Sequence, residues 1–388
     1  MSNTNIQFPV RGLHFLPQLS GMRFLAVLFV VVYHFSFVLM GFKWHYDLGA
    51  FIVFFFVLSS YLVTRILIDA KLTAAENGMA NWKVGVAFLI RRTLRIFPAY
   101  YLYLFILMAF VVAGAEVRQH PAVYFAYLYN YWIFITNSWG PFTVHIWTLA
   151  VEEQFYLIWP WIIMLIPTRH LPKVFAFMVF GGIAFRVTML TADPSVAQFP
   201  MLVLSPSCMD SFAAGALLAY YHCRGKVNSQ WLKIAVFIAI PIWLTLIFTQ
   251  HHRSFIGLDR TFISLFTVAV IDKGIRGFTG IIKKIMENST VQYLSKISYG
   301  IYLYHLIVPL FFWKIFALVH RGLLQRGFDL SYLEKLMGSS YFSFTVYFLM
   351  AIGCATISWY CLEKPFNNLK RLFRYTMPKK KLAGGEQP

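Results

Sequence analysis

Ionisable side chains stand within stretches that are otherwise apolar and long enough to cross a membrane. Arg23 and His34 lie eleven residues apart in the first of these stretches, and a later stretch contains the adjacent Glu152 and Glu153. Eleven residues at 100° each end about 20° past three full helical turns, so Arg23 and His34 share one helix face, about 16 Å apart along the axis. An ionisable group inside a bilayer is costly and indicates function by default, so all four are candidate site residues.

A buried histidine beside a carboxylate suits general base catalysis. Histidine has a pKa of about 6.5 in water and can take the proton of an attacking hydroxyl group. A nearby carboxylate can fix the tautomer and stabilise the imidazolium. Glu152 and Glu153 are expected at a depth similar to that of His34, and because adjacent side chains point about 100° apart we expect different roles for them. A simpler interpretation stays open, in which the histidine is hydrogen-bonded in a bundle and either glutamate pairs with an arginine.

The stretch FLIRRTLRIFPAY places Arg92 and Arg95 on one helix face at the start of a predicted span. Arginine binds phosphate groups through a planar, bidentate fork, although such a pair also fits plain anchoring at a cytoplasmic helix end. Together with His34, the pair suggests that cytoplasmic arginines hold an anionic acyl carrier such as acyl-CoA while its thioester reaches inward. A thiolate leaving group, with a pKa of about 8.5, needs little acid assistance.

Other polar residues within apolar stretches are weaker candidates. Tyr299 and His305, in KISYGIYLYHLIVP, are candidate cofactor-binding residues, although a single histidine in an aromatic helix is more often a packed residue. Asp210 and Arg186 are candidate substrate-binding residues, and the interpretation that we favour is a structural ion pair between them. Ser59 is a candidate substrate-binding residue and a candidate nucleophile if transfer runs through an acyl-enzyme.

The composition indicates a membrane protein, most of whose surface contacts lipid. Of the 388 residues, 59% are hydrophobic, 19% are aromatic and 13% are charged, and the mean hydropathy is +0.63. A soluble domain has about twice that share of charge. The net charge of +19 forms no basic face, because lysine and arginine fall between apolar runs, so nucleic-acid binding is not expected. The four cysteines show no CxxC spacing and predict neither a disulfide framework nor a metal site.

Apolar runs of sufficient length predict an all-α membrane protein with about ten transmembrane helices. These runs cover residues 20–41, 48–69, 93–115, 145–166, 173–191, 202–222, 231–250, 254–272, 297–319 and 340–362. Most of the 34 lysines and arginines fall on the side of the N-terminus, which predicts that both termini are cytoplasmic. Segment 119–151 contains no Asp, Glu, Lys or Arg and is expected to be interfacial or re-entrant. An eleventh span there would move the basic tail outside.

We expect three parts along the chain. Residues 1–15 form a cytoplasmic N-terminal segment, residues 16–366 form one membrane domain, and residues 367–388 form a basic cytoplasmic tail. The tail is suited to contact lipid headgroups, so membrane lipid is an expected partner.

Several motifs resemble those of the acyltransferase-3 family of integral membrane acyl-CoA-dependent O-acyltransferases. LSGMRFLAVLFVVVYHF is similar to its Arg-x10-His motif, RRTLRIFPAYY to its Arg-x-x-Arg-(Ile/Leu)-x-Pro motif, and WTLAVEEQFYLIWP to its WSLxVEEQFY motif. FFFVLSSYLVTRIL, SYGIYLYH and EKPF resemble further segments. The six motifs occur in the family's order between about residues 16 and 366, which makes the resemblance specific.

The resemblance implies a helical membrane fold of about ten spans in the cell membrane, a bacterial inner membrane. It implies transfer of an acyl group, most often acetyl from acetyl-CoA, to a hydroxyl group of a carbohydrate or a sugar-bearing small molecule. Carried over by position, the site residues are His34 as catalytic base, Arg23 supporting it, Arg92 and Arg95 at the CoA, and Glu152 and Glu153 in the active centre.

Two positions depart from the family's pattern. Ser60 replaces the glycine of the family's SG dipeptide. Cys208 stands two residues before Asp210, at a position where the family often has an arginine. The role of an Arg–Asp pair in acceptor binding therefore does not transfer directly, although Arg186 is a candidate substitute for that arginine.

The strongest alternative is a multi-span transporter or channel that uses Arg, His and Glu as a proton or substrate relay. We find no inverted repeat and no paired broken helices in the sequence, which favours the transferase. Within the transferase reading, direct attack by the acceptor is favoured over an acyl-enzyme on Ser59 or His34.

Overall fold

The computed structural model describes residues 16–40, 49–110, 112–192, 198–248, 252–326, 329–331, 335–336, 338–373 and 375, and the regular structure within these ranges is helical. The long helices are α1 (Pro17–Met40), α2 (Gly49–Glu76), α3 (Asn81–Ala109), α7 (Trp147–Leu165), α8 (Leu171–Ala192), α10 (Met209–Cys223), α11 (Ser229–Phe248), α12 (His252–Arg276), α16 (Val308–Leu324) and α18 (Ser340–Ser358). The short α-helices are α4 (Ala115–Gln119), α5 (Pro121–Phe125), α6 (Tyr129–Thr136), α9 (Gln198–Leu202), α13 (Gly280–Met286), α14 (Ser289–Lys296), α15 (Ser298–Tyr304) and α19 (Lys364–Asn368). Single turns occur as η1 (Val144–Ile146), η2 (Thr168–His170), η3 (Ser205–Cys208), the π-helix η4 (Trp359–Glu363) and η5 (Leu369–Leu372).

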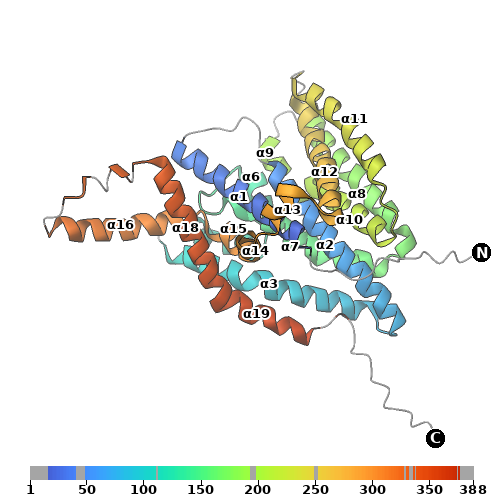
Figure 1. The fold of residues 1–388 in the computed structure, drawn as a ribbon, viewed down its shortest axis with the longest axis horizontal. Helices are drawn as coiled ribbons and strands as arrows, with labels where there is room; N and C mark the ends of the chain where they lie inside the picture. The colour runs from blue at the N-terminus through green and yellow to red at the C-terminus, as the bar shows by residue number, and fades with distance from the viewer. Residues whose placement is uncertain are drawn as a thin grey trace, which may run out of the picture.

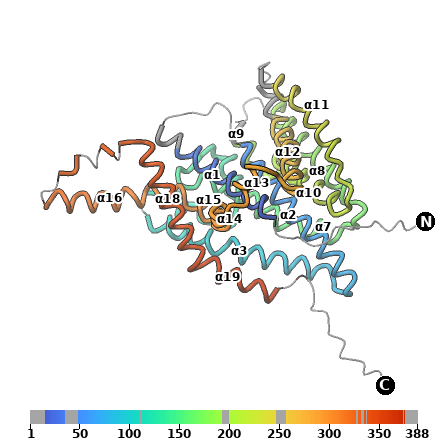
Figure 2. Tube along the Cα trace, viewed as in Figure 1, coloured from blue at the N-terminus to red at the C-terminus, as the bar shows by residue number. Residues whose placement is uncertain are grey.

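Helix α1 connects two groups of helices (Figure 1). On one side, α2, α8, α10, α11 and α12 pack together, and on the other side α3, α15 and α18 lie near one another. Helix α1 contacts α2 and α12 of the first group and α15 and α18 of the second. The chain trace in Figure 2 shows α16 extending away from both groups. The middle of the molecule, where α1, α2, α3, α7 and α15 meet, is therefore where a buried site can form.

Among the described helices, five are long and apolar enough to cross a membrane. They are α1, α2, α8, α11 and α18, and the bent pair α15 and α16 makes a sixth if it counts as one span. The predicted number of about ten is not confirmed. Each of the other predicted runs does coincide with a helix, but α10 has only 15 residues, and α3, α7 and α12 carry charged side chains that lower their hydropathy.

The bend between α15 and α16 has a local cause. Pro309 stands in the first turn of α16, and the axes of the two helices differ by 64°. Proline lacks the backbone N–H that a continuous helix needs, and its ring clashes with the preceding turn. The predicted span at 297–319 is therefore a broken helix, made of α15 and α16.

Segment 119–151 begins with short helices and turns, as its lack of charge and its breaks predict. Helices α5 and α6 contain five and eight residues, and they are separated by Tyr127, which has a positive φ of 55°. Asn137 ends α6 in the left-handed conformation. A membrane-length helix does not occur between residues 119 and 143, all of which the structure describes.

Helices α2 and α7 are joined at three heights by side-chain hydrogen bonds. The bonds are Ser59 to Glu152 (2.9 Å), Trp159 to Thr64 (2.8 Å), and Lys71 to the carbonyl oxygens of Ile163 and Ile166 (2.7 Å each). The Lys71 ammonium thus satisfies carbonyl groups at the C-terminal end of α7, which have no partner within the helix. From Ser59 to Lys71 the four bonds cover about 18 Å of α2.

Helix α10 packs directly on the backbone of α2, and Gly215 allows this contact. A Cβ atom at Gly215 would lie 2.1 Å from the carbonyl oxygen of Val57. Replacing Gly215 by alanine is therefore expected to lower the free energy of unfolding by about 1–3 kcal/mol, measured as a lower thermal midpoint in detergent. The matched control is Gly353→Ala in α18, where an added Cβ meets no atom within 4 Å. An unchanged midpoint for Gly215→Ala would contradict this packing.

Candidate active site

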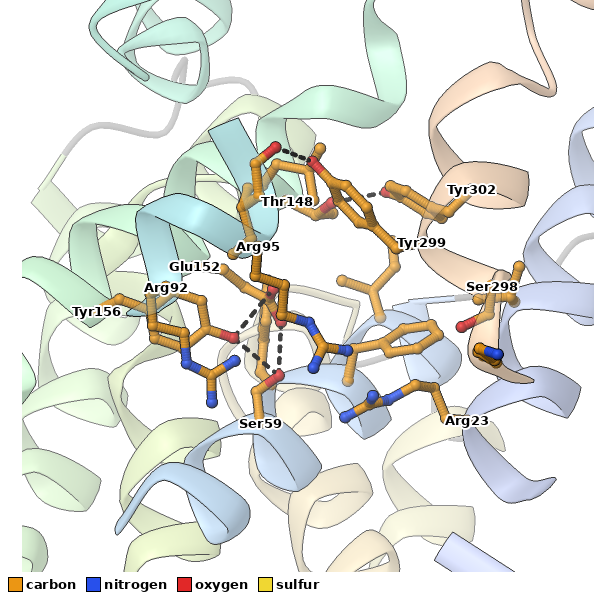
Figure 3. Close-up of a pocket in the computed structure, with 17 residues that line it drawn as sticks. Arg23, Ser59, Arg92, Arg95, Thr148, Glu152, Tyr156, Ser298, Tyr299 and Tyr302 are labelled. Carbon is orange, nitrogen blue, oxygen red and sulfur yellow. Dashed lines mark hydrogen bonds between the residues drawn. The ribbon is translucent and has the colours of Figure 1, made fainter. Parts of the chain in front are cut away.

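A pocket of about 820 Å³, including its open mouth, lies where α1, α2, α3, α7, α14 and α15 converge. Its charged lining consists of Arg23, Arg92, Arg95, Lys296 and Glu152. In Figure 3 the guanidinium groups of the three arginines point into the same region of the pocket. Four cations therefore face one carboxylate, a balance that attracts an anionic ligand such as a phosphate ester.

The spacing of the arginines on α3 decides which of them enter the pocket. Arg92 and Arg95 both line it, as their shared helix face predicts. The Arg92 guanidinium lies over the ring of Tyr156, 4.7 Å from its centroid. Arg91 instead donates hydrogen bonds to the carbonyl oxygens of Lys370 and Phe373, at 2.7 and 3.0 Å. Arg91 thus holds the C-terminal segment, while the other two arginines are available to a ligand.

The adjacent glutamates have different surroundings, as the helix geometry predicts. Glu152 lines the pocket and accepts hydrogen bonds from Ser59 (2.9 Å) and from the hydroxyl group of Tyr156 (3.3 Å). Glu153 does not line the pocket, and its buried Oε1 atom has no hydrogen-bond partner among the described residues. Ser59 is therefore a partner of Glu152 in the wall of the pocket.

His34 belongs to a cluster of three histidines. Its Nδ1 atom lies 2.9 Å from Nε2 of His305, and the two rings are stacked with centroids 4.9 Å apart. His145 completes the cluster, with its ring centroid 5.0 Å from that of His305. Both His145 and His305 are buried. We predicted a carboxylate as the partner of His34, but the hydrogen-bond partner that the structure provides is His305, because α15 packs against α1 at this height while Glu152 turns toward Ser59.

His34 lies beyond the inner end of the pocket. Val27 of the same helix lines the pocket, and His34 follows it by seven residues, which is about 10 Å along the axis. Tyr302 connects the two regions: it lines the pocket, its hydroxyl group donates to the carbonyl oxygen of His145 (2.8 Å), and its own carbonyl oxygen lies 2.6 Å from Nδ1 of His305. Tyr302 and Thr148, which both line the pocket, thus contact the histidine cluster through hydrogen bonds to the carbonyl oxygen of His145.

The two candidate residues on α15 have different places. Tyr299 lines the pocket and donates a hydrogen bond to the carbonyl oxygen of Ile96 on α3, at 3.0 Å. His305 is not in the pocket lining but beside His34, so its predicted role in cofactor binding is replaced by a contact with the candidate base.

Lys296 and His145 were not among the predicted site residues. Lys296 is the first residue of KISYGIYLYHLIVP, and His145 stands two residues before WTLAVEEQFYLIWP. Lys296 lines the pocket, and His145 is buried against His305. Two features of the sequence could have indicated them. Lys296 stands two residues before the aromatic motif SYGIYLYH, and His145 lies seven residues before the candidate acid Glu152.

Arg186 and Asp210 form the ion pair that we favoured, away from the pocket. The bidentate contact measures 2.7 and 3.0 Å, and both side chains are at most 1% exposed. Thr261 and the carbonyl oxygens of Ser207 and Gly257 satisfy the remaining groups. Neither residue lines the pocket, so the contacts fit a structural pair that joins α8, α10 and α12.

Cys208 lies beside another arginine. The guanidinium of Arg260, on α12, lies 2.7 Å from the Cys208 sulfur and 2.9 Å from the carbonyl oxygen of Leu202. A guanidinium group therefore lies beside position 208, where the acyltransferase-3 family often has an arginine. Here the group belongs to a residue of a different helix, α12. Within the part of the chain that the structure describes, no group of three or more His, Cys, Asp or Glu side chains is arranged to hold a metal ion.

A helical bundle with a cationic pocket and a nearby cluster of buried histidines is compatible with a membrane enzyme. The family model described as an acyltransferase domain, acyltransferase-3, matches residues 16–363, so the chain belongs to that family. This membership supports a transferase and disfavours the transporter that we considered as the alternative.

Two curated relatives are named as O-acetyltransferases. The chain is 29% identical over 324 residues to the peptidoglycan O-acetyltransferase OatA of Listeria monocytogenes, covering 75% of this chain and 49% of that protein. It is 26% identical over 320 residues to the "Putative peptidoglycan O-acetyltransferase YrhL" of Bacillus subtilis, covering 75% of this chain and 48% of that protein. The chain thus spans about half the length of these relatives. No solved structure matches it significantly.

Proposed function

We propose that this protein is a membrane O-acyltransferase. It takes an acyl group, acetyl from acetyl-CoA, on the cytoplasmic side and transfers it to a hydroxyl group of a carbohydrate acceptor. The observation that carries the proposal is the pocket with four cations whose inner end, at Tyr302, adjoins the cluster of His34, His145 and His305.

The pocket suits the donor because CoA carries several phosphate groups on one end and a thioester on a long, flexible arm. Arg92 and Arg95 offer planar forks to phosphate oxygens, and Arg23 and Lys296 add positive charge around them. The arm then extends along α1 from Arg23 toward His34, a rise of about 16 Å. The aromatic wall formed by Phe55, Tyr299 and Tyr302 accommodates its apolar parts.

The transfer needs one base and no external reductant or oxidant. His34 accepts the proton of the acceptor hydroxyl group as the oxygen attacks the thioester carbonyl carbon. A carbon–oxygen bond forms, the carbon–sulfur bond breaks, and its electron pair leaves with sulfur as the CoA thiolate. The proton on His34 then passes to that thiolate, which restores the neutral histidine and releases CoA.

The acceptor is a hydroxylated carbohydrate at the cell surface. Peptidoglycan is named for the two relatives, and a polysaccharide, a glycolipid or a sugar-bearing small molecule offers the same nucleophile. Because His34 is not part of the pocket lining, we expect the acceptor and the donor to reach it from different directions. The family membership and the two bacterial relatives support a protein of a bacterial cell membrane that binds acyl-CoA from the cytoplasm.

Purified protein in lipid nanodiscs is expected to release CoA from labelled acetyl-CoA only when a glycan acceptor is present. The assay follows free thiol and acetylated product with peptidoglycan fragments, polysaccharide precursors and glycolipids as acceptors. Direct attack predicts that the protein itself carries no label when the acceptor is omitted. Label on the protein would show an acyl-enzyme instead, and failure to consume acetyl-CoA with every acceptor would contradict the proposal.

A further inference from the structure

The hydrogen bonds around His305 bear on which ring nitrogen of His34 carries a hydrogen. We propose that His305 is a positioning residue, which holds His34 in the tautomer that carries hydrogen on Nδ1 and leaves Nε2 free to act as the base. This inference rests on the proposed function, in which His34 takes the proton of the acceptor. The contact with His305 would explain why His34 is ready to take that proton.

A backbone carbonyl group can only accept a hydrogen bond. Nδ1 of His305 lies 2.6 Å from the carbonyl oxygen of Tyr302, so this nitrogen carries a hydrogen. A neutral imidazole has one N–H group, and Nε2 of His305 is therefore an acceptor. Nδ1 of His34 lies 2.9 Å from that acceptor and must donate to it. The remaining ring nitrogen of His34, Nε2, then has a free lone pair.

The geometry gives His305 the place that a carboxylate occupies in a Ser-His-Asp triad. There, the acid accepts the Nδ1–H of the catalytic histidine and fixes its tautomer and orientation. Here the acceptor is a neutral imidazole, which avoids placing another negative charge inside the membrane. When His34 becomes an imidazolium, its Nδ1–H still points at the lone pair of His305, so the charged form is also hydrogen-bonded.

The position of His305 is itself fixed from two sides. His145 meets its ring edge to face, with centroids 5.0 Å apart and planes at 71°. Nε2 of His145 is 3.0 Å from the carbonyl oxygen of Leu303 and therefore donates to it, so Nδ1 of His145 carries no hydrogen. The aromatic rings of Phe35 and Tyr302 close further sides. The imidazole of His305 has little freedom to turn its acceptor away from His34.

Two substitutions of His305 distinguish a role in orienting His34 from a role in filling space. In His305→Gln the amide oxygen reaches approximately the place of Nε2 and can accept from His34, whereas His305→Leu fills the space without an acceptor. We expect His305→Leu to lower kcat about 100-fold or more, with the KM for acetyl-CoA changed less than about threefold. His305→Gln is expected to keep kcat within about tenfold of the wild type. Equal losses in both variants, with both still folded, would overturn the role of the acceptor.

A second measurement reads the tautomer without activity. In protein labelled with nitrogen-15 at histidine, the signals of His34 are identified by their absence in His34→Gln. We expect wild type and His305→Gln to show the Nδ1–H tautomer of His34, and His305→Leu to lose it. An Nε2–H tautomer in the wild-type protein would overturn the inference, even if the variants fail to fold. If His34→Gln remains active, the proposed base is wrong regardless of the tautomer, so the two failures are distinguishable.

Discussion

Replacing His34 by glutamine is expected to lower the rate of acyl transfer by about 10²- to 10⁴-fold, the usual contribution of a general base. Glutamine preserves the size and hydrogen-bonding capacity of the side chain but cannot take a proton from the acceptor hydroxyl group. The KM for acetyl-CoA is expected to change little, because the cationic pocket ends at Tyr302 and His34 is not part of its lining. The measurement is the initial rate of CoA release with saturating acceptor.

The matched control is His170→Gln. His170 lies in η2, between α7 and α8, where its contact is with the adjacent Arg169. It makes the same chemical change outside the site, so its rate is expected to equal that of the wild type. His34→Ala is expected to be as inactive as His34→Gln, and thermal midpoints close to the wild type are expected for both glutamine variants. Robust activity of either His34 variant would remove this histidine from the mechanism.

Replacing Arg95 by alanine is expected to weaken binding of acetyl-CoA by about 10- to 100-fold, which corresponds to losing hydrogen bonds to a charged group. The effect is expected in Kd and KM, with a smaller change in kcat, because Arg95 lines the cationic pocket and not the histidine cluster. Arg95→Lys is expected to be intermediate, since lysine keeps the charge but loses the planar fork. Titration of the purified protein with CoA, followed by calorimetry, measures both variants.

Arg91→Ala is the control for charge alone. It removes the same positive charge from the same helix, but its guanidinium binds the carbonyl oxygens of Lys370 and Phe373 outside the pocket. We expect it to lower the thermal midpoint and to leave the Kd for CoA within about threefold. A loss of CoA affinity equal to that of Arg95→Ala would mean that the overall charge of the helix, and not its pocket face, attracts the donor.

Local periodicity predicted those parts of the site that lie on one helix. Arg92 and Arg95 are three residues apart and both line the pocket, and Glu152 and Glu153 point to different surroundings. These relations follow from the helical angle between neighbours and need no knowledge of other helices. The predicted helices are also present at each of the ten apolar runs, although fewer of them are apolar enough to count as spans.

Helical periodicity could not predict which residues of different helices come into contact. The partner of His34 lies 271 positions later in the chain, on a helix whose direction depends on the break at Pro309. We chose a carboxylate because its depth matched, but equal depth does not determine which faces meet. Residues 1–15 and 376–388, which include the predicted N-terminal segment and most of the predicted tail, lie outside the described residues, and the cytoplasmic location of both termini stays a prediction.

The four hydrogen bonds that α2 makes with α7 and its C-terminal end are expected to limit which parts of this protein move during a catalytic cycle. Sliding one helix by a single residue, about 1.5 Å, or turning it by 100° is expected to strain all four bonds together. We therefore expect the two helices to move together as one unit that includes the hydrogen-bonded pair Ser59 and Glu152. A passage that admits a bulky sugar chain is therefore expected to form from elements other than α2 and α7.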